Sequence, residues 1–263
     1  MRITVLGKSP AWQDAGGACS GYLVQEGGTS LLLDCGSGVF AKLRERIDYC
    51  ALDAVVITHM HADHFFDVIP FAYALIYTPR QQPVPVAGWP GTDTPARPRL
   101  HLPLGGLEIF RTVVGAFGDR ELVEKAFAVS EYEPDDVIDV EGLAVRFRRV
   151  PHYIATHATE VRAPDGARFV FGADSRPNDA IVEFADGADL LMLESTLPRP
   201  ERQGLRGHLT PGEAGDHGRR AAAKRLVITH VSDELDLEWA QAEATKTYGA
   251  PAEVAADGAV YEL

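Results

Sequence analysis

The chain has 263 residues, of which 46% are apolar, and this length and composition suit a soluble globular protein with a large core. Its net charge of −13 disfavours nonspecific binding to nucleic acid or to anionic membranes, although bound metal ions could still attract a small anionic substrate. The three cysteines form no CxxC pair, and neither a signal peptide nor an apolar stretch of membrane length is visible. We therefore expect reduced thiols, a cytoplasmic location and no membrane partner.

Strands and one helix are predicted before residue 58. Apolar and β-branched runs between glycine-rich turns predict strands at residues 2–6, 21–24, 30–34 and 54–57. Residues 39–47 predict a helix between the last two of them. Asp34 ends the third strand in an acidic, glycine-rich turn, where capping the turn is its simplest role.

The densest cluster of metal-capable side chains follows the strand at 54–57. It reads Thr-His-Met-His-Ala-Asp-His and contains His59, His61, Asp63 and His64, just before a helix predicted from Asp63 to Ile76. Imidazole and carboxylate groups suit zinc, with manganese or iron as alternatives. His59 and His61 alternate in an extended segment and can face one metal. The adjacent Asp63 and His64 face different sides, which indicates a second metal nearby.

The pattern His59-x-His61-x-Asp63-His64 resembles the motif of the metallo-β-lactamase superfamily of binuclear hydrolases, and the resemblance extends over nearly the whole chain. It implies an α/β fold, a four-layer αβ/βα sandwich. No linker interrupts the sequence, so we expect residues 1–263 to form a single domain. The resemblance also implies two divalent metal ions, Zn²⁺ with Mn²⁺ or Fe²⁺ as alternatives, and gives Asp34 a supporting role below them.

The middle of the chain is rich in proline. Seven prolines between residues 79 and 103 disfavour long regular elements, so we expect only an edge strand at 84–87. His101 is predicted to be a solvated loop histidine. Residues 106–128 predict one or two helices, which by the resemblance form either a lid beside the active site or a dimer surface.

Strands resume at residues 137–150, and the third histidine ligand of the family is expected just after them. His152 matches that position best, and His157 is the alternative. Asp174 follows a strand in Gly-Ala-Asp-Ser, which resembles the family's Ser-Gly-Asp-Thr element. The resemblance makes Asp174 the carboxylate that bridges both metals; the alternative is an N-cap for the helix that starts near Asn178.

Two further residues resemble the glutamate–histidine pair of ribonuclease Z-like enzymes. Glu194 ends a buried strand, and His208 precedes a helix that Thr210 and Pro211 open. A carboxylate keeps an imidazole charged and oriented, so that it can bind a phosphoryl oxygen or protonate a leaving group. The alternative for His208 is a helix-entry residue bonded to nearby backbone.

The last motif strand ends in Ile-Thr-His, which repeats Ile57-Thr58-His59 and indicates internal duplication. Its His230 matches the final ligand of the second metal, whereas His217 has no motif support and is predicted to face solvent. The resemblance therefore implies three groups of residues. His59, His61 and His152 hold one metal; Asp63, His64 and His230 hold the other; and Asp174 bridges, while Asp63, His208 and Glu194 act in catalysis.

These residues imply a phosphodiesterase of the ribonuclease Z-like branch. The tRNA-processing members carry a long arm between the third histidine and the bridging aspartate, but here residues 164–166 predict only a turn. We therefore expect a small phosphodiester substrate such as a cyclic nucleotide, rather than a nucleic acid, and a monomer or homodimer. Arg199, Arg202 and Arg206 either meet its phosphate or form a solvated loop.

Four other functions remain open at this point. A thioesterase or a lactonase of the same superfamily would not be expected to carry the Glu194–His208 pair, and a tRNA 3′-processing endonuclease would carry the arm. A di-iron redox or sensing module usually has glutamate at the position of His61.

Overall fold

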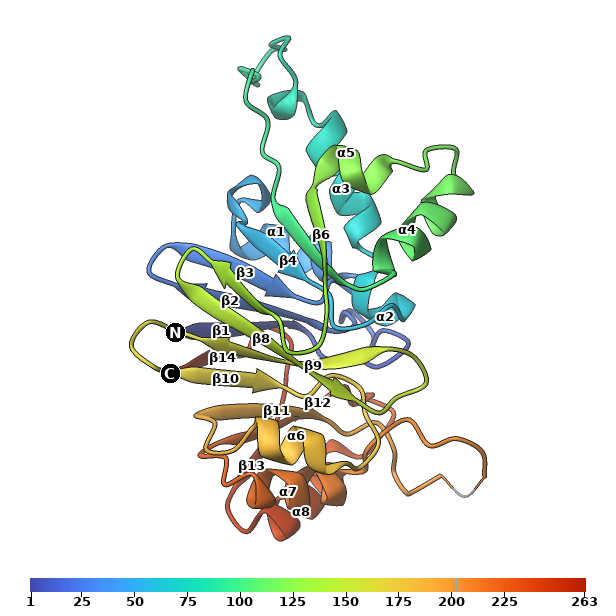
Figure 1. Cartoon of the computed structure of the whole chain (residues 1–263), viewed down its shortest axis with the longest axis vertical. Coiled ribbons are helices and arrows are strands. Elements are labelled where there is room, and N and C mark those ends of the chain that lie inside the picture. The colour runs from blue at the N-terminus through green and yellow to red at the C-terminus, as the bar shows by residue number, and fades with distance from the viewer. Residues whose placement is uncertain (202) are drawn as a thin grey trace.

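Two β-sheets pack face to face, and helices cover the outer face of each (Figure 1). The structure is a computed structural model that describes residues 1–201 and 203–263, so the predicted role of Arg202 lies outside the described residues. The four-layer αβ/βα sandwich predicted from the sequence is confirmed.

Each sheet has seven strands and combines an antiparallel half with a parallel half. In spatial order, the first sheet contains β14 (Val260–Glu262), β1 (Arg2–Gly7), β2 (Gly21–Glu26), β3 (Thr29–Leu33), β4 (Ala54–Val56), β5 (Arg99–Pro103) and β6 (Ala128–Tyr132). The second contains β13 (Ala252–Val254), β12 (Leu226–Thr229), β11 (Leu190–Glu194), β10 (Arg168–Phe171), β9 (Thr156–Arg162), β8 (Leu143–Val150) and β7 (Val137–Val140).

The helices divide between the two sheets. Beside the first sheet lie α1 (Val39–Arg46), α2 (Ala62–Phe65), α3 (Val68–Tyr77), α4 (Gly106–Gly115) and α5 (Leu122–Ala126) (Figure 1). The second sheet is covered by α6 (Asp179–Phe184), α7 (Pro211–Arg220) and α8 (Leu237–Tyr248). Two 3₁₀ turns, η1 (Tyr49–Ala51) and η2 (Pro79–Gln81), complete the elements among the described residues.

The core between the sheets follows from the alternation of side chains along the strands. Every second residue of β8 is buried from Leu143 to Phe147, as expected for a strand with one solvated face. Aromatic pairs join the two inner faces: the rings of Tyr132 and Phe147 stack at 3.7 Å, and those of Tyr22 and Phe171 lie 4.7 Å apart. This layer fixes the two sheets relative to each other and so fixes the site at their edge.

Two predictions for the proline-rich region were wrong. Residues 99–103 form the strand β5, which pairs in parallel with β4 on one side and β6 on the other, so His101 is a buried strand residue. This strand escaped prediction because both of its faces are buried, so its sequence lacks the alternation of apolar and polar residues that marks a half-exposed strand. Residues 84–87 form no strand; Val86 and Trp89 exchange two backbone hydrogen bonds across a tight turn.

Among the described residues, no helix combines the length and the apolar character needed to cross a lipid bilayer.

Candidate metal centre

The predicted ligands gather at one edge of the sandwich, because several strands end there. The motif segment follows β4 and includes α2, whereas His152, Asp174 and His230 follow β8, β10 and β12 of the second sheet. These three strands run in the same direction, since β9 lies antiparallel to both β8 and β10, and β10, β11 and β12 are parallel. Residues separated by up to 171 positions therefore meet without any long loop.

Three histidines form the first ligand group. The Nδ1 atom of His61 lies 3.1 Å from Nε2 of His59 and 3.1 Å from Nε2 of His152. In a tetrahedral zinc site with Zn–N bonds of about 2.0–2.1 Å, neighbouring ligand nitrogens lie about 3.3 Å apart. The carboxylate Oδ2 of Asp174 lies 3.8 Å from Nε2 of both His59 and His152 and completes the group.

The second ligand group contains Asp63, His64, His230 and again Asp174. Nε2 of His64 lies 3.5 Å from Oδ2 of Asp63 and 3.4 Å from Oδ1 of Asp174. Nε2 of His230 lies 3.2 Å and 3.5 Å from Oδ2 of the same two carboxylates. Asp174 thus belongs to both groups, and its two oxygens face different histidines, which is the arrangement expected of a bridging ligand.

Unsatisfied buried atoms show that these residues fit metal ions. Nε2 of His64 and Oδ1 of Asp174 are buried and have no hydrogen-bond partner among the residues that the structure describes. A buried polar atom without a partner costs about 1–3 kcal/mol, so such atoms persist where a ligand satisfies them. Imidazole nitrogens and carboxylate oxygens are the donors that zinc and related divalent ions take.

The charges of the two groups call for a cation. Burial opposes charge on Asp174, but the nearby His230, His64 and His59 hold its pKa well below the usual value. Burial also opposes charge on His64, but the surrounding carboxylates outweigh it and raise its pKa. Burial and the neighbouring His64 instead lower the pKa of His59 and keep it neutral. A divalent ion would supply the positive charge that the carboxylates require.

Asp34 holds the first part of the motif from behind. Its Oδ2 accepts hydrogen bonds from Nδ1 of His64 at 2.7 Å and from Oγ1 of Thr58 at 2.9 Å, and its Oδ1 accepts from the backbone of Thr58 at 2.7 Å. Thr58 Oγ1 in turn lies 3.1 Å from Nδ1 of His59. Both histidines therefore turn Nε2 towards the ligand group, as ligands held by a carboxylate usually do. The structure thus places Asp34 in the supporting position that the resemblance implied.

Glu194 supports residues that follow the strands of the second sheet, as Asp34 supports those that follow β4. Its carboxylate accepts hydrogen bonds from Nδ1 of His208 at 3.0 Å, from the backbone of Ser175 at 3.1 Å, and from the backbone and hydroxyl of Thr196. Nδ1 of His230 lies 2.7 Å from the Thr196 hydroxyl and donates to it when Nε2 faces a metal. One carboxylate thus orients both a predicted ligand and His208. Because it already accepts four hydrogen bonds, Glu194 is poorly placed to bind a metal itself.

His208 lies beside the ligand groups without belonging to the two that contain Asp174. Burial opposes its charged form, but the hydrogen bond and charge of Glu194 outweigh burial and raise the pKa of His208 to about 9. Its Nδ1 lies 3.9 Å from Oδ2 of Asp174. The helix that follows starts with a complete capping box of Thr210 and Glu213, which fixes the backbone next to His208. Glu194 therefore favours the charged form of the imidazole and orients it beside the two candidate ligand groups.

The structure separates the two histidines that the sequence left open as third ligand. His152 turns Nε2 to His61 and donates from Nδ1 to the carbonyl of Gly207 at 2.8 Å. His157 lies on β9, and its ring contacts the ring of Tyr132 edge-on at 5.3 Å rather than the ligand groups. His217, predicted to face solvent, is buried, so that prediction was wrong; its Nε2 accepts a hydrogen bond from the backbone of Asn178 at 3.1 Å.

His152→Ala should weaken metal binding far more than His157→Ala. Each substitution removes a histidine whose side chain is buried, but only His152 has a ring nitrogen 3.1 Å from another candidate ligand atom. We expect the metal affinity of the first variant to fall at least about tenfold. Removing a residue that only supports a ligand already costs about 10–100-fold, and His152 is itself a candidate ligand. Competition with a chelator measures this affinity, and thermal unfolding of the metal-free variants separates it from a loss of stability. The reverse ranking would reassign the ligand.

A cavity of about 420 Å³ opens over the metal centre. Its inner wall consists of candidate ligands together with His208 and Thr196, and its outer wall of side chains that no motif predicted: Pro10, Ala11, Trp12 and Tyr153. The loop between β1 and β2 supplies the first three, so this glycine-rich segment borders the active site. Only the loop itself was predictable from the amino-acid pattern, and its position beside the candidate ligands was not.

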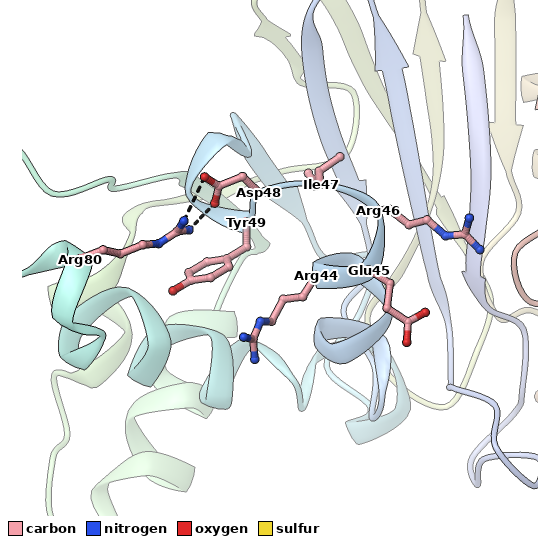
Figure 2. A pocket seen from close by; sticks show the side chains of 7 residues that line it. All are labelled: Arg44, Glu45, Arg46, Ile47, Asp48, Tyr49 and Arg80. Carbon is pink, nitrogen blue, oxygen red and sulfur yellow. Dashed lines mark hydrogen bonds and ion pairs between the residues drawn. The ribbon is translucent and has the colours of Figure 1, made fainter. Parts of the chain in front are cut away.

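A second hollow, of about 440 Å³, lies at the end of α1 and differs in character (Figure 2). Arg80 pairs there with Asp48, and its guanidinium lies 4.7 Å from the centre of the Tyr49 ring. Figure 2 shows Arg46 and Glu45 directed away from this pair. Arg80 and Asp48 satisfy each other, and the charged groups do not converge on a common point, so this hollow is not a second candidate site.

Known proteins resemble the chain over its full length. A family model described as a beta-lactamase superfamily domain matches residues 29–231. A ribonuclease Z of Myxococcus xanthus is 30% identical over 304 aligned positions, which include all of this chain and 98% of that protein. The probable metallo-hydrolase YhfI of Bacillus subtilis is 29% identical over 268 positions and covers 100% of both chains.

Solved structures agree. The crystal structure of YhfI superposes with a TM-score of 0.83 at 26% identity and covers 99% of each chain. The short form of human tRNase Z has a TM-score of 0.74 at 22% identity, covering 100% of this chain and 99% of that one, which shows a shared fold. The family match, the relatives and the fold together establish that the chain belongs to the β-lactamase superfamily, as a hydrolase with the metallo-β-lactamase fold.

Proposed function

We propose that the chain is a phosphodiesterase that uses two divalent metal ions, zinc foremost, to hydrolyse a small phosphodiester such as a cyclic nucleotide. The observation that carries the proposal is the position of the His208–Glu194 pair beside two ligand groups that share Asp174. A protonated imidazole suits a reaction in which a poor leaving group, an alkoxide, departs from phosphorus. The ribonuclease Z relative is, by its name, an enzyme that cleaves phosphodiesters.

The residues divide the work as follows. When bound, two metal ions would supply an activated water at neutral pH and stabilise the charge of the phosphoryl oxygens. Asp63 can orient that water or accept its proton, because its Oδ2 faces the second ligand group. Its pKa is lowered to about 2, which keeps the carboxylate ionised and favours the orienting role. Burial opposes this shift, but His64 and His230 outweigh it. His208 can donate its proton to the leaving oxygen, and Glu194 holds it in place.

Three observations favour a small substrate over tRNA. Between β9 and β10 the chain makes only a tight turn, closed by hydrogen bonds of 3.0 Å between Ala163 and Gly166 and between Ala163 and Ala167. The alignment with the ribonuclease Z extends over 304 positions although this chain has 263 residues, so the ribonuclease carries additional segments. The net charge of −13 also disfavours a polyanion. Arg206, one of the candidate phosphate contacts, instead pairs with Glu213 and bonds the carbonyl of His208.

Purified protein should contain two divalent metal ions per chain, because seven donor residues form two groups around one shared carboxylate. Elemental analysis of active protein measures this number, and one ion or none would contradict the proposal. A hydrolysis screen should then compare bis-p-nitrophenyl phosphate, cyclic nucleotides, a tRNA precursor, thioesters and lactones. We expect turnover of the first two. Activity confined to thioesters or lactones would assign the chain to another reaction, and redox activity of bound iron would assign it to another class.

A further inference from the structure

We propose that Trp12 and Tyr153 form an aromatic binding site for the planar ring of the substrate, so that the enzyme prefers phosphodiesters that carry a nucleobase. This inference rests on the proposed function for the phosphodiester and adds the chemistry of the rest of the substrate. Both side chains line the cavity that contains the candidate metal ligands His61, Asp63, Asp174 and His230.

Trp12 is exposed, although its loop is held firmly. Its exposed fraction is 51%, which is unusual for the largest apolar side chain. The loop is tied to the segment after His230: the amino group of Lys8 donates to the carbonyl of Val231 at 2.7 Å and pairs with Asp14, which accepts from the backbone of Asp233 at 3.0 Å. The indole is therefore presented on a fixed frame beside a metal ligand. An exposed aromatic group kept in place beside polar catalytic residues indicates a binding surface.

Tyr153 also lines the cavity and is held by its neighbours. Its hydroxyl donates to Oε1 of Glu201 at 3.0 Å, and its ring lies 4.8 Å from that of His152. The ring also covers the backbone at Gly207, where an added Cβ would lie 2.2 Å from it. Glu201 accepts a second hydrogen bond from the backbone of Gly207 at 3.1 Å, so it links the tyrosine hydroxyl to the same backbone that the ring covers. The tyrosine is thus fixed from two directions, yet 43% of its surface stays exposed.

The size and chemistry of the cavity suit a nucleotide. At about 420 Å³ it falls in the range of roughly 300–1,000 Å³ that is typical of small-molecule sites. Its polar wall lies at the metal centre and its apolar wall at Trp12, so a phosphate at the metals would direct an attached planar ring towards the aromatic side chains. Base–aromatic stacking is worth about 1–3 kcal/mol and tolerates different bases, because every base has a π-face. We therefore expect the enzyme to prefer substrates that carry a base but to discriminate little among the different bases.

The test compares a substrate that has a base with one that lacks it. Trp12→Ala and Tyr153→Ala should lower kcat/KM for adenosine 2′,3′-cyclic phosphate by about 10–100-fold, mainly through KM. Trp12→Ala should leave kcat/KM for glycerol 1,2-cyclic phosphate, which has no base, within about twofold. Tyr153→Ala also removes a ring that packs against His152, so its effect on base recognition is the ratio of its losses on the two substrates. Trp12→Phe should retain most activity. Trp89→Ala is the matched control, because Trp89 is 49% exposed and does not line this cavity.

A binding measurement keeps this inference separate from the proposed function. Adenosine monophosphate should quench the fluorescence of the metal-loaded wild type, and Trp12→Phe should abolish the quenching while Trp89→Phe preserves it. Equal losses of kcat/KM on both cyclic phosphates, or quenching that persists in Trp12→Phe, would overturn the aromatic site. If the wild type hydrolyses no phosphodiester, the proposed function fails, and the quenching result alone decides whether a base binds at Trp12.

Discussion

Asp174→Ala should lose both metal ions and hydrolytic activity together. Its carboxylate faces His59 and His152 of one ligand group and His64 and His230 of the other, so its removal takes one donor from each. Two cations held close together also repel each other, and the shared negative charge offsets that repulsion. Each ion supplies several kcal/mol of transition-state stabilisation, so we expect kcat/KM to fall by about 10⁴-fold or more.

Elemental analysis after gel filtration and turnover at saturating zinc measure the two losses. Asp174→Asn separates charge from shape, because the amide keeps the volume of the side chain but not its charge; it should behave like the alanine variant. Asp189→Ala is the control, since this carboxylate stands at the start of β11, the opposite end of the strand from the site, and pairs with Lys224. Two ions bound at wild-type affinity in Asp174→Ala would show that Asp174 only supports the turn after β10.

The part of the site that the residues predicted by themselves has local geometry, whereas the distant ligands His152, Asp174 and His230 were predicted only through the family resemblance. His59, His61, Asp63 and His64 lie within six residues, and the strand before them and the helix after them fix their directions. The helix predicted from Asp63 to Ile76 is in fact two helices, α2 and α3, because the backbone N–H of Asp67 donates to the carbonyl of Cys35 at 3.0 Å rather than to the carbonyl four residues before it. Such a contact depends on a distant segment and leaves no local pattern.

Long-range contacts also explain the histidines whose surroundings the sequence misjudged. His101 lies in a parallel strand between two others, and its Nδ1 bonds Ser130 Oγ at 2.8 Å on the neighbouring strand. His217 is buried, and its Nε2 accepts a hydrogen bond at 3.1 Å from the backbone of Asn178, which caps α6. Neither neighbour is close in sequence, so hydropathy and spacing could not identify them.

The supporting residues Thr58 and Thr196 illustrate the same limit. Each threonine hydroxyl links a histidine to a carboxylate, Thr58 between His59 and Asp34 and Thr196 between His230 and Glu194. Threonine is common in strands and turns, so its type alone predicts no role. The chain uses this device once in each sheet, but the second threonine is not the one in the repeated Ile-Thr-His sequence, because the hydroxyl of Thr229 lies 2.7 Å from the hydroxyl of Tyr22 instead.

His208→Ala should slow phosphodiester hydrolysis while leaving the metal content nearly unchanged. Its ring lies 4.9 Å from the ring of His152 and 5.7 Å from that of His230, but its Nδ1 is bonded to Glu194. Loss of a general acid costs about 10²–10⁴-fold in rate. The raised pKa of about 9, due to Glu194 acting against burial, keeps the imidazole protonated at neutral pH and ready to donate. Turnover and metal content of the purified variant measure both effects.

The leaving group distinguishes proton donation from substrate binding. An alkoxide leaves slowly without a proton, whereas p-nitrophenolate needs little protonation, so the cost of His208→Ala should shrink on bis-p-nitrophenyl phosphate. Glu194→Gln should show a weaker form of the same pattern, since the amide still accepts a hydrogen bond from His208 but no longer stabilises its charge. An equal loss on activated and unactivated substrates would instead assign His208 to substrate binding. Full activity on both would remove it from the catalytic residues, because an imidazole that donates the leaving-group proton cannot be dispensable for an alkoxide.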